Sequence, residues 1–141
     1  MSLYAESSAV LSWLLGEPGS DVVRMTLSNA ELVLASDLTL IECERVLIRA
    51  TATGSLSEAT AADRRARLRQ VSEHWAILSL DSEVSERARR PFPPEPIRTL
   101  DAIHLATALL ARSLVPGTRL LSLDQRIRSS GKELGFEVVP G

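Results

Sequence analysis

The sequence predicts an α/β fold in which a parallel central sheet is flanked by helices. Short apolar runs, of the length of buried strands, alternate with longer segments whose apolar residues recur at helical spacing. Residues that break regular structure stand between these segments, and no internal repeat interrupts the alternation. A chain of 141 residues is long enough to bury one core, so we expect a single domain over residues 1–141.

The first half of the chain shows this alternation clearly. The segment Gly16-Glu-Pro-Gly19 separates two helical stretches, and Gly54 ends a third. Ser55 and Glu58 have the spacing of a capping box and are expected to start the next helix. The elements expected here are strand 2–5, helix 8–15, helix 20–29, strand 31–35, helix 38–52 and helix 55–74.

The second half continues the pattern after a short strand-like run. Asp81 or Ser82 is expected to cap a helix, and four prolines make residues 90–96 a loop. The elements expected here are strand 75–80, helix 82–89, helix 99–114, strand 119–123, helix 124–130 and strand 136–139. Strands that are separated by helices indicate βαβ units, which place the strands parallel to one another with right-handed crossovers.

Composition narrows the classes of function. The formal net charge is −2 and the sequence pI is about 5.7, which argues against a protein that coats nucleic acid through bulk positive charge. A nuclease remains open, because metal-binding acids lower the total charge. Cys43 is the only cysteine, so we expect a small buried side chain rather than a disulfide or a zinc site. No apolar run is long enough to span a bilayer, and we expect a cytoplasmic protein without a membrane partner.

Four acidic residues stand just after strand-like runs or near helix starts: Glu6, Glu42, Asp101 and Asp124. Taken singly, each has an ordinary interpretation, because acids are favourable at helix N-termini as caps or as partners of the helix dipole. In a parallel α/β fold, however, those N-termini share the edge of the sheet at which ligands bind. Four carboxylates at that edge, without clustered His or Cys ligands, suit Mg²⁺ or Mn²⁺ rather than zinc.

Other polar residues could support such a site. His104 follows Asp101 by three residues and shares its helical face, so it is expected either as a proton donor or as a buried, hydrogen-bonded histidine. Ser7 and Ser122 could donate hydrogen bonds to the acids, as could Ser8. The basic residues are 15 Arg and one Lys, and Arg98 and the arginines of residues 64–69 could hold an RNA backbone. A solvated helix face is an equally good interpretation of these arginines.

Several motifs together resemble the PIN-domain family. They are Tyr4-Ala-Glu-Ser-Ser-Ala9, Ser36-Asp-Leu-Thr-Leu-Ile-Glu42, Leu100-Asp-Ala-Ile-His-Leu-Ala-Thr-Ala108 and Leu121-Ser-Leu-Asp-Gln-Arg-Ile127, followed by Leu134-Gly-Phe-Glu-Val-Val-Pro140. The matches come in the order of the family and span nearly the whole chain. The chain most resembles the small bacterial VapC-type toxins of toxin–antitoxin pairs.

This resemblance implies a Mg²⁺- or Mn²⁺-dependent endoribonuclease of a type II toxin–antitoxin system, with a PIN-like sheet between helices. It also implies catalytic and metal-binding roles for Glu6, Glu42, Asp101 and Asp124, and a supporting role for Ser122. The implied partners are an RNA substrate, a second copy of the chain, and a cognate antitoxin whose tail occupies the active-site groove. The chain departs from the family at Glu6, where an Asp is usual.

The extra methylene at Glu6 leaves an alternative function open, because metal geometry is sensitive to small displacements. That alternative is a PIN-fold binding protein with weakened or lost catalysis. A metal-dependent phosphatase of another α/β family is a second alternative, although such enzymes usually need a nucleophilic Asp directly after the first strand. A purely structural dimer module is a third, but it leaves the four acids unexplained.

Overall fold

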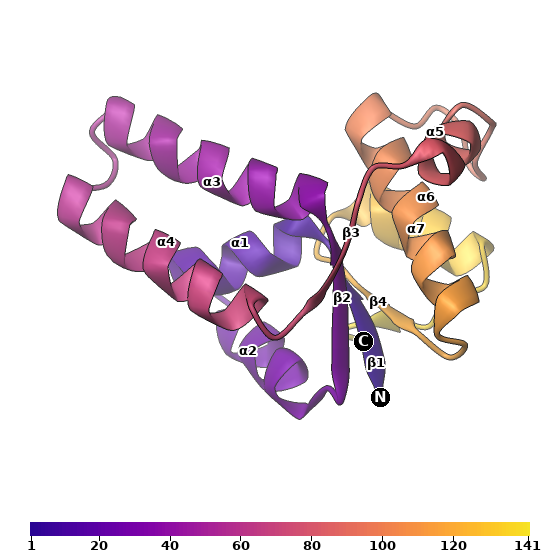
Figure 1. Ribbon diagram of the computed structural model, residues 1–141, viewed down its shortest axis with the longest axis horizontal. Helices are drawn as coiled ribbons and strands as arrows, with labels where there is room; N and C mark the ends of the chain where they lie inside the picture. The colour runs from indigo at the N-terminus through magenta and orange to yellow at the C-terminus, as the bar shows by residue number, and fades with distance from the viewer.

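The computed structural model describes all 141 residues as a five-stranded parallel sheet with helices on both faces. The strand order is β3-β2-β1-β4-β5, so the first strand lies at the centre. Helices α1 to α4 cover one face, and α5 to α7 cover the other (Figure 1). The strands are β1 (Ser2–Ala5), β2 (Leu32–Ser36), β3 (Ala76–Leu78), β4 (Arg119–Leu121) and β5 (Val138–Val139).

The central strands supply both hydrophobic cores because successive side chains point to opposite faces of a sheet. In β1, Leu3 and Ala5 are buried beneath α1 and α3, whereas Tyr4 is buried on the face covered by α6. In β4, Leu120 and Leu121 divide between the two faces in the same way. This continuous burial explains why each strand appears in the sequence as an unbroken apolar run.

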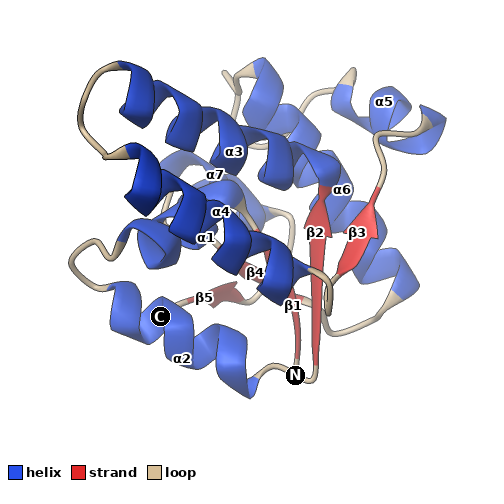
Figure 2. Ribbon diagram, turned by 60° about the vertical axis from the view of Figure 1, so that its left-hand side comes forward, coloured by secondary structure: helices blue, strands red, loops and turns tan.

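The helices agree closely with the sequence-based expectations. They are α1 (Ser7–Leu15), α2 (Ser20–Asn29), α3 (Asp37–Ala52), α4 (Glu58–Ser72), α5 (Ser82–Ala88), α6 (Thr99–Leu114) and α7 (Gln125–Glu133). Figure 2 shows α3 and α4 packed side by side, with β2 leading directly into α3. Asp81 caps α5, as expected from the sequence, by accepting a hydrogen bond from the backbone N–H of Val84. No helix is both long enough and apolar enough to cross a lipid bilayer.

Two predicted helix ends are wrong. Helix α4 is capped by Ser57, which accepts a hydrogen bond from the N–H of Thr60, and not by Ser55. Helix α7 continues through Gly131, which was expected to break it, because this glycine allows the helix to approach β4 closely. A Cβ at Gly131 would lie 2.4 Å from the Cδ2 atom of Leu120. Gly135, with φ at 88°, follows the helix and turns the chain toward β5.

The order of the strands defines the place where a site is expected. The chain leaves β1 toward β2 on one side, and β4 returns to the other side of β1. Parallel α/β sheets bind their ligands outside the carboxyl ends of the strands at such a reversal. Glu6 directly follows β1 at this edge, and Asp124 lies three residues after the end of β4. The topology therefore brings two of the four predicted acids together across most of the sequence length.

Candidate active site

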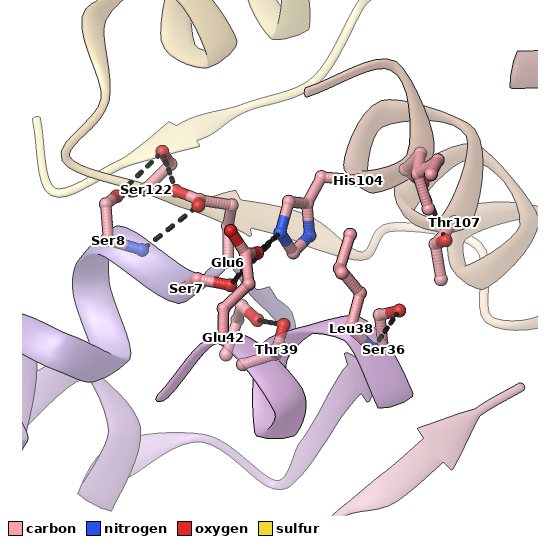
Figure 3. A network of polar contacts seen from close by, with 12 residues as sticks. Glu6, Ser7, Ser8, Ser36, Leu38, Thr39, Glu42, His104, Thr107 and Ser122 are labelled. Carbon is pink, nitrogen blue, oxygen red and sulfur yellow. Dashed lines mark hydrogen bonds and ion pairs between the residues drawn. The ribbon is translucent and has the colours of Figure 1, made fainter. Parts of the chain in front are cut away.

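Glu6 is the most buried of the four acids, with 4% of its surface exposed, and it caps α1. Its Oε2 atom accepts a hydrogen bond from the backbone N–H of Ser8 at 3.0 Å. Its Oε1 atom accepts hydrogen bonds from the hydroxyl groups of Ser8 at 2.5 Å and Ser122 at 2.6 Å. Both carboxylate oxygens are therefore held by donors of the protein itself (Figure 3).

The same two serines bind the segment that follows β4. Ser8 Oγ accepts hydrogen bonds from the backbone N–H groups of Leu123 at 2.9 Å and Asp124 at 3.1 Å, and Ser122 Oγ accepts a second one from the Asp124 N–H at 3.1 Å. We call Glu6, Ser8 and Ser122 the serine clamp. The clamp joins the start of α1 to the connection that carries Asp124, and so it fixes the position of this second acid.

Glu42 lies in the second turn of α3 and belongs to a buried network of hydrogen bonds. Its Oε1 atom accepts from the Ser7 hydroxyl at 2.8 Å and lies 2.5 Å from His104 Nε2 (Figure 3). The other ring nitrogen of His104 lies 3.1 Å from the hydroxyl of Tyr4. His104 is 2% exposed, whereas Glu42 is 28% exposed, so the network runs from the core to the surface. The Oε2 atom of Glu42 has no protein partner.

The protonation states in this network follow from its contacts. Burial raises the pKa of the Tyr4 phenol well above its usual value, so its hydroxyl can donate to His104 Nδ1 and leave Nε2–H to donate to Glu42. Burial alone would raise the pKa of Glu42, but the hydrogen bonds that it accepts from His104 and Ser7 outweigh it. The pKa of Glu42 is therefore lowered, and its carboxylate is anionic at neutral pH.

Asp101 lies in the first turn of α6, and its carboxylate forms no hydrogen bond or ion pair with another protein group. Burial raises the pKa of its carboxyl group, and the negative charges of Asp124 and Glu6 raise it further, against an opposing effect of Arg98. Asp124 caps α7, with its Oδ1 atom accepting from the N–H groups of Arg126 and Ile127, each at 3.0 Å. Its Oδ2 atom has no protein partner.

Glu6 and Asp124 thus lie near enough to Asp101 for their charges to raise the pKa of its carboxyl group. Glu42 belongs to a separate network with Ser7, which follows Glu6 in the chain, and His104, which lies one helical turn after Asp101. No three carboxylate, imidazole or thiol side chains converge closely enough in this arrangement to hold a metal ion together. The donor set nevertheless fits Mg²⁺, which is commonly bound by one or two carboxylates with water and substrate phosphate completing its coordination. Asp101 and Asp124 have the carboxylate oxygens that are free for this purpose.

The structure changes the interpretation of several residues. The ordinary interpretation of Glu42 as part of a helix cap is wrong, because Ser36 caps α3. Thr39, which has capping-box spacing to Glu42, donates instead to the carbonyl of Ala5 at 3.4 Å. His104 is a buried, hydrogen-bonded histidine, as one of its two interpretations expected. Sequence reasoning missed Tyr4, for which the available signal was an aromatic hydroxyl in the strand directly before Glu6.

The arginines of residues 64–69 do not surround this site. Arg64 and Arg67 form ion pairs with Asp63. Arg65 and Arg69 form ion pairs with Glu44. These contacts lie on α4 and α3, which supports a solvated, ion-paired helix face. Arg98 differs from them, because it has no partner, immediately precedes α6 and is close enough to lower the pKa of Asp101.

Cys43 is buried, as expected from the sequence. Burial raises the pKa of its thiol to about 12, with smaller contributions from the charges of Glu42 and Glu6. A thiol with such a pKa is protonated at neutral pH and is a poor nucleophile. The chemistry of this site therefore rests on its carboxylates.

Comparison with known proteins identifies the family. The PIN-domain family profile matches residues 3–133. The chain is 36% identical to ribonuclease VapC46 of Mycobacterium tuberculosis over 138 residues, covering 98% of this chain and 96% of that protein. It is 32% identical to ribonuclease VapC35 of the same species over 142 residues, covering 99% of this chain and 97% of that protein.

Solved structures support the same fold. The crystal structure of VapC20 from Mycobacterium tuberculosis, a toxin that cleaves the sarcin–ricin loop, superposes with a TM-score of 0.64 at 15% identity, covering 95% of each chain. A toxin–antitoxin complex from Klebsiella pneumoniae gives a TM-score of 0.65 at 18% identity, covering 97% of this chain and 95% of that one. From the family profile and the full-length relatives, we conclude that this chain belongs to the PIN-domain family and, within it, to the VapC-type proteins.

Proposed function

We propose that the protein is a divalent-metal-dependent endoribonuclease, the toxin of a type II toxin–antitoxin pair, that hydrolyses RNA phosphodiesters. The observation that carries this proposal is the position of three acids at the carboxyl edge of the sheet: Glu6 directly follows β1, Asp124 follows β4, and Asp101 lies in the first turn of α6. Burial, and then the charges of Asp124 and Glu6, raise the pKa of Asp101, which agrees with this placement. Three acids near one another, with Arg98 as the one opposing arginine charge on Asp101, are suited to a cation. The full-length relatives that are named ribonucleases support RNA as the substrate.

Asp101 and Asp124 would hold the cation, with Glu6 and Glu42 completing the acidic site. The cation, Mg²⁺ or Mn²⁺, would supply a nucleophile at neutral pH by lowering the pKa of bound water and would stabilise negative charge on the phosphate. The residues of the chain position these groups. The N–H groups at the start of α7 fix Asp124 Oδ1 and orient its free Oδ2 atom.

Glu42 has a second task in this proposal. Ser7 and His104 both engage its Oε1 atom, which leaves the anionic Oε2 atom free to accept a hydrogen bond from water or from an RNA hydroxyl group. Because His104 is buried and held by Tyr4, it acts on the reaction by orienting Glu42 rather than by touching the substrate. The serine clamp fixes Glu6 and the Asp124 connection in the same manner.

The proposed partners are a cognate antitoxin and a second copy of the chain. The solved neighbours include complexes of toxins with antitoxins, which supports the first partner. The proposal also treats residues 1–141 as one functional domain. A phosphatase with a carboxylate nucleophile is disfavoured, because both oxygens of Glu6 are engaged by Ser8 and Ser122. The full-length relatives named ribonucleases favour an enzyme over a binding protein without activity.

The test is RNA cleavage by the purified chain with Mg²⁺, with Mn²⁺ and with EDTA. We expect cleavage with a divalent ion, none with EDTA, and loss of at least about a hundredfold in rate for Asp101→Asn, the size of effect that removing one electrostatic catalytic group produces. Glu58→Gln is the matched control, because Glu58 is an exposed acid in the first turn of α4, distant from the site. Its rate should equal that of the unmodified chain.

Two results would contradict the proposal. Cleavage that persists unchanged in EDTA would exclude the divalent-metal mechanism. If the Asp101→Asn variant folds normally and cleaves RNA at the original rate, the carboxylate of Asp101 takes no part in the reaction. Circular dichroism of both variants establishes that they are folded before the rates are compared.

A further inference from the structure

Most basic side chains of this protein are already engaged by other groups. Ion pairs with carboxylates engage Arg24, Arg64, Arg65, Arg67, Arg69 and Arg119. Aromatic rings or backbone carbonyls engage Arg87, Arg89, Arg112 and Arg128. The basic side chains without any such contact are Arg45, Arg49, Arg90, Arg98, Arg126 and Lys132.

Two of these free arginines line a groove beside Glu42. The groove has a volume of about 450 Å³ and lies between α3 and the start of α6, with Glu42, Arg45 and Arg49 along α3 and Leu100 opposite. We call it the α3 groove. Arg45 and Arg49 are exposed and four residues apart, so they share a helix face and are displaced by about 6 Å along the helix axis. The rest of the lining is apolar, from Leu38, Ile41 and Val46 of α3, so Arg45 and Arg49 supply the positive charge of this groove.

Two more of them line a second hollow on the other side of the acids. It also has a volume of about 450 Å³, and it lies between the proline-rich loop and the start of α7. Arg98 and Arg126 line it, both exposed, and we call it the α7 groove. Arg98 is close enough to Asp101 to lower its pKa, and Arg126 stands two residues after Asp124. Helix α3 follows β2 and α7 follows β4, which lie on opposite sides of the central strand that leads into Glu6. The two grooves, with two free arginines each, are therefore expected on opposite sides of the acids.

This distribution has a physical consequence for a polyanionic substrate. The carboxylates that would bind a cation also repel phosphate groups, so an RNA strand needs positive charge on both sides of the site to stay in place. Arginine suits that task, because its guanidinium group is always charged and its planar donors match phosphate oxygens. None of the flanking arginines forms an ion pair, so their charge is available to the substrate. Glu95 also lines the α7 groove, but its carboxylate is held by the N–H groups of Phe92 and Ile97.

We propose that Arg45 and Arg49 in the α3 groove, together with Arg98 and Arg126 in the α7 groove, bind the phosphates of one RNA strand on either side of the scissile bond. This inference rests on the proposed ribonuclease function and adds the path of the substrate. These contacts go to the backbone, so they position the strand without selecting its sequence. The bond that is cut lies where the two grooves meet the acids.

The test measures binding of a labelled single-stranded RNA of mixed sequence in EDTA, as a function of salt concentration. Two double variants, Arg45→Ala/Arg49→Ala and Arg98→Ala/Arg126→Ala, each remove two proposed phosphate contacts. Each double variant should weaken RNA binding about tenfold. The slope of the logarithm of the association constant against the logarithm of the salt concentration should fall in magnitude by about 1.4, the value expected for the loss of two phosphate contacts with a single strand. The KM for RNA cleavage with Mn²⁺ should rise in parallel.

Arg64→Ala/Arg67→Ala is the matched control, because it removes the same charge from arginines that are paired with Asp63 on α4. Its salt slope should stay at the original value. If either groove variant has the same salt slope as the control, the inference is wrong. It is also wrong if a groove variant binds RNA normally but no longer binds an acidic peptide, because the grooves would then serve a protein partner. The ribonuclease proposal fails separately, if the unmodified chain does not cleave RNA.

Discussion

Shortening Glu6 to Asp tests the serine clamp directly. The substitution keeps the negative charge and withdraws the carboxylate by the length of one C–C bond, about 1.5 Å. The contacts of Oε1 with Ser8 Oγ at 2.5 Å and Ser122 Oγ at 2.6 Å would lengthen to about 4 Å, beyond hydrogen-bond range. The bond from the Ser8 N–H can survive, because Asp is a good N-cap.

The expected loss of stability follows from these contacts. A hydrogen bond to a charged group contributes about 1.5–3 kcal/mol, so two lost bonds set an upper limit of about 6 kcal/mol. The two hydroxyl groups lie 3.3 Å apart and can bond to each other, which recovers part of the loss and leaves about 2–3 kcal/mol. Since unfolding entropy is about 2.1 cal/mol/K per residue, the melting temperature of this 141-residue chain should fall by about 7–10 °C.

Thermal unfolding in EDTA, followed by circular dichroism, measures this change. Glu17→Asp is the matched control, because it makes the same chemical change in an exposed loop and should leave the melting temperature unaltered. A double-mutant cycle with Ser122→Ala isolates the contact itself and should give a coupling free energy of about 1.5–3 kcal/mol. A Glu6→Asp melting temperature equal to that of the unmodified chain, with zero coupling to Ser122, would refute the clamp.

Three further predictions concern the other acids and the packing of α7. Because the pKa of Glu42 is lowered by folding, its ionisation stabilises the protein above about pH 4, and this contribution is lost as the pH falls. Glu42→Gln should therefore reduce the dependence of the unfolding free energy on pH in the acid range, as measured by urea unfolding. Burial and the charges of Asp124 and Glu6 raise the pKa of Asp101, so its ionisation lowers the stability of the fold as the pH rises. Asp101→Asn in EDTA should therefore have a higher unfolding free energy than the unmodified chain at pH 7, and an equal one at pH 3. Gly131→Ala should lower the unfolding free energy by about 1 kcal/mol, because the clash with buried Leu120 exceeds the gain in helix propensity. An unchanged unfolding free energy in calorimetry would contradict the close packing of Gly131 against Leu120.

The elements were predictable because their signals are local. A buried strand such as residues 2–5 needs only a short apolar run. Helix α2 begins directly after Pro18-Gly19, and α6 ends just before Pro116-Gly117. The errors arose where a distant contact overrides a local signal. Gly131 is an example, because its role as a site of close approach to Leu120 depends on the packing of α7 against β4.

The acidic residues were also predictable as candidates, because parallel strands bring helix N-termini to one edge. Glu42 shows the limit of that argument, since it lies in the second turn of α3 and reaches the site through His104 and Ser7. Arg65 and Arg69 were also candidates for RNA binding, but in the structure they form ion pairs with Glu44. Local spacing cannot show which charges are already neutralised.

By itself the sequence determined the alternation of strands and helices and the family, and it marked four acids as candidates, because each of these signals depends on residues close to one another along the chain. The tertiary structure decided which contacts those acids make. It placed Ser8 and Ser122 around Glu6, joined Glu42 to His104 across 62 residues of chain, and left four arginines unpaired beside the site. Such pairings are set by folding, since hydrogen bonds and charge repulsion act over a few ångströms in space whatever the separation in sequence.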